Sequence, residues 1–224
     1  MSSKTLYRLS GIGLLAGGLL MAIGLIGALF VIGSSPPDNP TATNASPAFP
    51  LVFLLIVCGL MLIAAGLPGI STRQVRQICP LGFTGFVLTM FGVLLDLGMA
   101  LFAAIVVPWL ATAAPKLQFA GPTSLFVLLY GAFLVLGIGS LALGLAIAQG
   151  NALPRTAGVI LIFSGLANVI AVLAWPISLF GFIGQILFAG AVAWIGYILV
   201  AQQGEEVVQP SLPVGEARST EVRS

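Results

Sequence analysis

The 224-residue chain contains no histidine, only two cysteines and few charged side chains, which make up 6% of its residues. Without histidine it lacks the commonest general base, the commonest transition-metal ligand and the usual axial ligand of a membrane haem. Cys58 and Cys79 are not spaced as a metal-binding or redox pair. We therefore expect neither a bound metal nor a cofactor.

The side-chain sets of several enzyme classes are missing as well. The long apolar segments hold no second aspartate for an aspartyl protease, no serine–histidine pair and no lysine for a retinal Schiff base. No Walker-type phosphate-binding sequence occurs, and no basic stripe is available for nucleic acid. We expect the chain not to be an enzyme and not to bind nucleic acid.

Hydrophobic residues, in contrast, make up 59% of the chain, more than a soluble fold of this size could bury. They form long runs separated by proline, glycine and charge, and Pro108 is expected to end the third run. We predict an all-α membrane protein with a six-helix transmembrane domain at 10–201, a cytoplasmic N-terminus at 1–9 and a disordered cytoplasmic tail at 202–224. The predicted spans are 10–32, 51–67, 81–107, 124–148, 156–173 and 177–201.

The cationic residues outside the spans predict the orientation. One set of connections carries Lys4, Arg8, Arg73, Arg76 and Arg155, whereas the opposite set carries only Lys116. Because cytoplasmic loops are enriched in lysine and arginine, both termini are expected in the cytoplasm, with the chain in the cell membrane. Trp109 and Trp175 then lie at the outer interface, where indole rings are favoured. The glycosylation sequence that begins at Asn44 falls on the same outer side.

Glycines recur at intervals that suggest an internal repeat. Pairs seven residues apart occur near the start of the first, third and fifth spans, and the even-numbered spans resemble one another less strictly. We predict three tandem two-helix hairpins whose small-residue faces let neighbouring helices approach closely. The glycines expected at these helix contacts are Gly11, Gly18, Gly85, Gly92, Gly158, Gly165, Gly137, Gly144, Gly181 and Gly196.

Asp96 is the only charged residue inside the six predicted spans. A charged side chain at the centre of a bilayer costs about 2.5–3.5 kcal/mol on insertion scales, so its presence calls for a partner or a function. It lies on the glycine face of the third span, and we predict an intramembrane polar cluster of Asp96, Asn168 and Gln185, with Thr89 adding a hydroxyl. Three roles remain open for the cluster: a neutral polar pin that fixes helix register, a protonation site or cation ligand in a permeation path, and contact with a partner.

The segment 66–115 carries short motifs that include Gly66-Leu67-Pro68-Gly69 and Val107-Pro108-Trp109-Leu110. With the later stretch Ala152-Leu153-Pro154-Arg155, it resembles a loosely defined group of bacterial six-span membrane proteins without an assigned activity. The resemblance implies a bacterial cytoplasmic membrane and carries no activity with it.

Two functions are consistent with these patterns. The first is a non-enzymatic accessory or scaffold bundle in the lipid bilayer, whose free small-residue faces would bind a partner membrane protein or a second copy of the chain. The alternative is a small-solute or ion carrier, proton-linked in one version, that uses Asp96. A scaffold should hold Asp96 sealed and dry, whereas a carrier should show a cavity that reaches Asp96 from at least one side.

Overall fold

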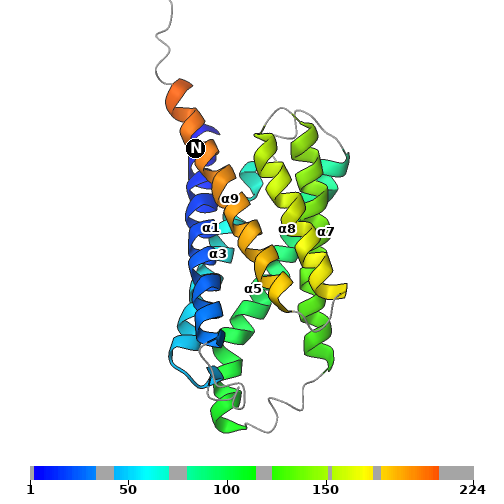
Figure 1. Cartoon of the computed structure of the whole chain (residues 1–224). Coiled ribbons are helices and arrows are strands. Elements are labelled where there is room, and N and C mark those ends of the chain that lie inside the picture. Colours follow the sequence, from blue (N-terminus) through cyan, green and yellow to red (C-terminus); the bar gives the residue numbers. More distant parts are fainter. Residues whose placement is uncertain are drawn as a thin grey trace, which may run out of the picture.

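The computed structural model describes residues 3–33, 43–70, 80–114, 123–150, 153–173 and 178–206. Within these ranges six helices are long and apolar enough to cross a bilayer, so the chain is a multi-pass helical membrane protein. The helices are α1 (Ser3–Gly33), α3 (Ala48–Gly66), α5 (Pro80–Ala113), α7 (Thr123–Gln149), α8 (Arg155–Leu173) and α9 (Ser178–Glu206). Figure 1 shows that the start of α1 and the last turns of α9 lie at the same end of the bundle.

All six helices overlap the spans predicted from the sequence, and the differences are at their ends. Helix α1 begins within the segment predicted as a cytoplasmic N-terminus, and α9 continues to Glu206. Helix α9 thus extends five residues, 202–206, into the segment that the sequence predicts as a disordered tail. Those residues extend a helix that is already nucleated, and each residue added to a formed helix gains one backbone hydrogen bond. The rest of the predicted tail lies outside the described residues.

Pro108 does not end the third span, contrary to the sequence prediction. It lies inside α5, which continues for five further residues to Ala113. One proline removes a single backbone donor, whereas ending the helix at this point would leave up to four carbonyl groups without a helical partner. The hydroxyl of Thr112 donates to the Trp109 carbonyl at 3.0 Å in the turn that follows the proline. Continuing the helix past Pro108 is therefore the less costly solution.

The helices pack as a closed ring in which each contacts its neighbours in the sequence. Helix α9 completes the ring by packing against α1 as well as α8. Small residues bring these helices together: a Cβ atom added at Gly18 would lie 2.5 Å from the carbonyl oxygen of Ala189 in α9. Every one of the ten glycines expected at helix contacts has atoms of another helix within 4 Å of that Cβ position.

The glycine pairs of the three hairpins, however, do not face equivalent neighbours. Gly11 and Gly18 of α1 face α9, and Gly158 of α8 faces α7, so both first helices turn their pair toward the hairpin that precedes them in the ring. Gly85 and Gly92 of α5 instead face α7, which is the second helix of their own hairpin. The seven-residue spacing is thus used for close packing in all three hairpins, but toward different neighbours.

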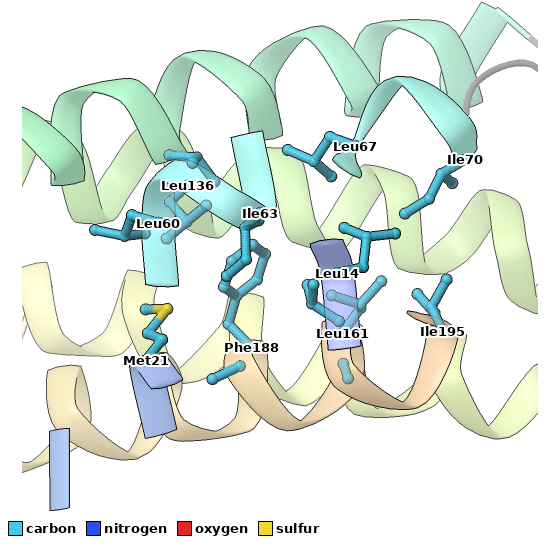
Figure 2. Packing of buried hydrophobic residues seen from close by; sticks show 14 of the residues in the cluster. Leu14, Met21, Leu60, Ile63, Leu67, Ile70, Leu136, Leu161, Phe188 and Ile195 are labelled. Carbon is cyan, nitrogen blue, oxygen red and sulfur yellow. The ribbon is translucent and has the colours of Figure 1, made fainter. Parts of the chain in front are cut away.

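The apolar core fills one half of the bundle. The largest fully buried side chains include Leu14, Ile63, Leu143, Leu161 and Ile195, all of which lie between the middle of their helices and the end that carries the termini. Figure 2 shows side chains from α1, α3, α8 and α9 converging there, with Phe188 and Met21 at the middle of the bundle. The other half of the bundle is where the candidate site lies.

Candidate functional site

A partly enclosed cavity of about 290 Å³ lies among α1, α3, α5, α7 and α9. Helix α8 contributes Ala171 near its last turn, and α5 contributes the largest share of the wall. The α5 residues that line the cavity are Asp96, Met99, Ala100, Phe102, Ala103 and Val107. Most of the remaining wall is apolar, so the carboxyl group of Asp96 is its main polar feature.

The lining residues place the cavity in the half of the bundle away from the termini. Helix α1 begins at the terminal end and lines the cavity with Met21 and Leu25, from its second half. Helix α9 returns toward the terminal end and contributes Gly181, Phe182 and Gln185, from its first half. The cavity therefore lies opposite the packed core, with the buried Met21 and Phe188 at the boundary between the two.

Asp96 lies on the face of α5 that the sequence analysis predicts. Gly85 and Gly92 on this face are buried against α7 in the terminal half of the helix. Asp96, Met99 and Ala103 continue the face at helical spacing and line the cavity. Asp96 is half-buried, and it is the only acidic or basic residue among the cavity-lining residues that the structure describes. The third helix thus turns its acid toward protein and cavity and not toward lipid.

Gln185 of α9 joins Asp96 in the cavity wall. Its side chain is only 3% exposed, and it lies close enough to the Asp96 carboxyl group to interact with it. Neither its amide nitrogen nor its amide oxygen meets hydrogen-bond geometry with any residue that the structure describes. Buried polar groups are normally paired, so an unpaired amide facing a cavity indicates a place where a ligand or water is bound.

Asn168 is close to Gln185 in the fold but does not line the cavity. It is fully buried in α8, where it packs between Gly137 of α7 and Gly184 of α9, the residue before Gln185. Both polar atoms of its amide lack a hydrogen-bond partner within the described residues. The neighbouring hydroxyl of Ser164 donates to the Gly184 carbonyl at 2.8 Å. Asn168 therefore belongs to the α7–α8–α9 contact behind Gln185, and not to the cavity wall.

Thr89 is also separate from the cavity. Its side chain is fully buried, and its hydroxyl donates to the carbonyl oxygen of Gly85 in the same helix at 2.8 Å. It lies seven residues before Asp96, on the side of the terminal end. Of the four residues predicted to cluster, the structure brings Asp96 and Gln185 to one cavity, with Asn168 next to Gln185 and Thr89 bonded within its own helix.

Aromatic side chains form a part of the site that the sequence analysis does not include. Five aromatic residues from four helices line the cavity: Phe53, Phe102, Tyr130, Phe133 and Phe182. Each lies in an apolar run in which phenylalanine is common, so composition does not distinguish a cavity wall from a lipid-facing surface. Their shared feature is depth, since all five lie in the helix halves away from the termini.

The arrangement can bind a ligand but offers few groups for chemistry. Within the described parts of the chain, no three histidine, cysteine, aspartate or glutamate side chains come together as a metal site would require. The cavity combines one carboxyl group, one unpaired amide and a largely apolar, aromatic wall. Such a combination suits recognition of a small ligand with one polar end.

Comparison of the chain with protein-family models, with curated proteins and with solved structures finds no match. The resemblance of residues 66–115 to bacterial six-span proteins is therefore not supported by an identified family. What does stand is the coarser part of that resemblance, six helices long and apolar enough to cross a membrane.

Proposed function

We propose that the protein is a small-solute carrier that binds its substrate at Asp96. The observation that supports this function over a scaffold is the cavity of about 290 Å³, which reaches Asp96 in the half of the bundle away from the termini. A carboxyl group that served only to fix helix register would be sealed and hydrogen-bonded between helices. Asp96 is instead half-buried in the wall of this cavity, where the Gln185 amide lies close enough to interact with it.

The small-residue faces give the scaffold function less support. A scaffold of this type needs close-packing faces that remain free for a partner. All ten glycines expected at helix contacts already have another helix within 4 Å of the position that a Cβ would take. These ten positions are thus occupied inside the bundle, whereas Gly98 and Gly190 have open space beside them.

A non-enzymatic role is part of the proposal. Asp96 and Gln185 can take part directly in substrate binding. Catalysis by acid–base or metal-dependent membrane enzymes would in addition require a second acid, a base or a metal. Among the described residues of the cavity wall, Asp96 is the only one with a carboxyl group, and Tyr130 is the other titratable side chain. Because an isolated carboxylate is costly at this depth, a proton or a bound cation would neutralise it in turn, which makes the carrier proton-linked.

Helix α5 supports movement around this site. Pro108 lies inside the helix next to Val107, which lines the cavity. The missing backbone donor leaves the carbonyl group of Ala104 without its helical partner, and proline is the commonest cause of a bend in a helix. Helix α5 is continuous through Pro108, and a bend at this proline would let one part of the bundle move against another, as parts of secondary transporters do.

The predicted orientation of the chain in the membrane determines which side of the membrane the cavity faces. From the predicted excess of cationic residues on the side of the termini we infer that both termini are cytoplasmic, which puts the half of the bundle that holds the cavity toward the outside. Arg8 and Arg155, the two of these residues whose side chains the structure describes, are both exposed and both near the terminal end.

The pairs α1–α3, α5–α7 and α8–α9 correspond to the three proposed hairpin repeats, and pairing of consecutive helices supports that assignment.

The test is solute entry into proteoliposomes. The purified chain is reconstituted, and three small radiolabelled solutes that do not cross lipid unaided are added outside: a hydrophilic primary amine that is protonated at neutral pH, a sugar and a sulfonate. The carrier proposal predicts that one of them enters faster than into protein-free liposomes. Entry should be lost in Asp96→Asn and retained in Ser140→Ala, which removes a buried polar group outside the cavity wall. Entry of none of the three, or equal entry with Asp96→Asn, would contradict the proposal.

A further inference from the structure

The cavity wall carries an unbalanced negative charge whenever Asp96 is ionised. Among the described residues that line the cavity, none is a lysine or an arginine, and Asp96 is the only acidic one. A buried carboxylate without a counter-charge is strongly disfavoured in an apolar environment, so the ligand that stabilises it must itself be positive. Because a single carboxyl group is involved, we expect the ligand to carry a single positive charge.

A bare metal ion does not fit this requirement. Calcium takes six to eight oxygen ligands, and magnesium needs near-octahedral coordination. The cavity offers one carboxyl group and the amide oxygen of Gln185 against a mostly apolar wall. The positive charge must therefore come from a group that needs few oxygen ligands, which is the property of an organic ammonium.

The aromatic residues of the wall support the same ligand class. Phe53, Phe102, Tyr130, Phe133 and Phe182 enter the cavity from α3, α5, α7 and α9. The faces of aromatic rings attract organic cations, and the attraction is larger where water is excluded. The same rings and the methionines Met21 and Met99 provide an apolar surface for the rest of the ligand.

Gln185 distinguishes between kinds of ammonium. Its amide is 3% exposed and lacks a hydrogen-bond partner within the described residues. A protonated amine can donate one N–H to the Asp96 carboxylate and another to the amide oxygen of Gln185. A quaternary ammonium has no N–H and would leave that amide unpaired, at a cost.

We propose that the cavity binds a small monovalent amine in its protonated form, with the ammonium group between Asp96 and Gln185 and an apolar body against the aromatic wall. A volume of about 290 Å³ is at the lower end of the range for ligand pockets, which excludes a whole two-chain lipid. This inference deepens the proposed carrier function and rests on it for its role in transport, although binding itself can be measured without transport.

The test uses three probes of similar size and the full-length protein in detergent at pH 7. Phenethylamine is protonated at this pH, phenethyl alcohol is its neutral counterpart, and benzyltrimethylammonium is a cation without N–H donors. Equilibrium dialysis should show that phenethylamine binds at least tenfold more tightly than phenethyl alcohol. Equal binding of the two would overturn the proposal, and this comparison needs only the wild-type protein, so it stands even if a variant fails to fold.

Two variants assign the contacts. Asp96→Asn should weaken binding of phenethylamine at least tenfold and leave phenethyl alcohol unchanged, which also shows that the variant is folded. Gln185→Leu should weaken binding of phenethylamine more than that of benzyltrimethylammonium. Ser140→Ala, the control outside the cavity wall, should change none of the three. Unchanged phenethylamine binding in Asp96→Asn, or an equal loss for both cations in Gln185→Leu, would contradict the assigned contacts.

Failure of this inference can be distinguished from failure of the proposed function. Entry of the sugar or the sulfonate into proteoliposomes, without amine binding, would overturn the ligand class and leave a carrier. Amine binding without entry of any solute would overturn the carrier and leave a binding protein for amines.

Discussion

Asp96 occupies a position where a carboxyl group is costly and its neighbours offer little compensation. Gln185 is the one amide beside it in the cavity wall, and the wall is otherwise apolar and aromatic. Interhelical hydrogen bonds in membranes contribute only about 0.6 kcal/mol on average, less than the cost of about 2.5–3.5 kcal/mol for an acid at mid-membrane. The residue is therefore easier to explain by function than by stability.

The contribution of Asp96 to the free energy of unfolding can be measured by replacing the acid with an apolar residue. Asp96→Leu should raise the free energy of unfolding by about 1–3 kcal/mol, because it replaces a poorly paired buried polar group with an apolar one in a cavity that has room for it. Thermal unfolding in detergent gives the measurement, and Met99→Leu, a neighbouring wall residue without a polar group, should change little. A clear loss of stability in Asp96→Leu would instead identify Asp96 as a structural pin.

Residue patterns in the sequence identify Asp96 and Gln185 but not the cavity that joins them. Asp96 is found because it is the one charge in an apolar span, and Gln185 because it shares a face with small residues. The aromatic wall cannot be found in this way, since Phe53 of α3 and Phe182 of α9 come to line the same cavity only when the helices are packed in a ring. Thr89 shares the face of Asp96 but bonds to its own helix instead.

At the scale of helices, close packing depends on where a glycine lies around the helix axis. In α5, Gly92 faces α7 so closely that a Cβ would lie 2.5 Å from the Cα of Leu136, a backbone atom that cannot move aside cheaply. Gly98 in the same helix has no other helix within 4 Å of its Cβ position. These two residues form a matched pair for a substitution test.

Gly92→Ala should lower the free energy of unfolding by about 1–3 kcal/mol, the usual cost of overpacking. Gly98→Ala should raise it by up to about 1 kcal/mol, because alanine is the better helix former and meets nothing at that position. Thermal unfolding of the two variants in the same detergent compares them directly. Equal effects would mean that the contact between α5 and α7 is not as close as described.

Pro108 provides a second test within α5. Pro108→Ala restores a backbone donor for the carbonyl group of Ala104, so it should stabilise the helix by up to about 3 kcal/mol. If α5 bends during transport, the same variant should slow solute entry into proteoliposomes although its thermal stability is higher. Faster or unchanged entry with higher stability would remove Pro108 from the transport mechanism.

Most helix positions could be predicted from the sequence, because a span needs a long apolar run and such runs are evident. The end of α5 could not be predicted in this way, since one proline removes only a single backbone donor and the helix continues past Pro108 to Ala113. The neighbours of each helix were also not predictable. Gly85 and Gly18 each belong to a pair of glycines that are seven residues apart. Gly85 nevertheless faces the second helix of its own hairpin, whereas Gly18 faces α9.

At the scale of the whole molecule, the bundle is closed by its core at one end and hollow toward the other. The large side chains Leu14, Ile63 and Ile195 fill the half near the termini (Figure 2), and the lining residues of the cavity lie in the opposite half. A carrier with one side closed and one side open has this asymmetry. Because of this asymmetry, the orientation of the bundle in the membrane decides on which side of the membrane the cavity lies.

Reporter fusions test the proposed orientation. Alkaline phosphatase, which is active only outside the cytoplasm, should be inactive when fused after Ser224 and active when fused after Ala114, which follows the end of α5. The start of α1 and the last turns of α9 lie at one end of the bundle, whereas the last turn of α5 lies at the other end. The reverse pattern of activity would place the cavity on the cytoplasmic side.

The most direct measurement of the central claim is the reactivity of a cysteine placed in the cavity wall. In a chain with Cys58→Ala and Cys79→Ala, Ala103→Cys lies in the wall of the cavity, and Ile105→Cys lies two residues further on the exposed, lipid-facing side of α5. A charged thiol reagent that cannot cross lipid, added outside, should modify Ala103→Cys and spare Ile105→Cys, and excess phenethylamine should slow the reaction. If Ala103→Cys resists the reagent from both sides of the membrane, the cavity does not connect Asp96 to water and the account is wrong.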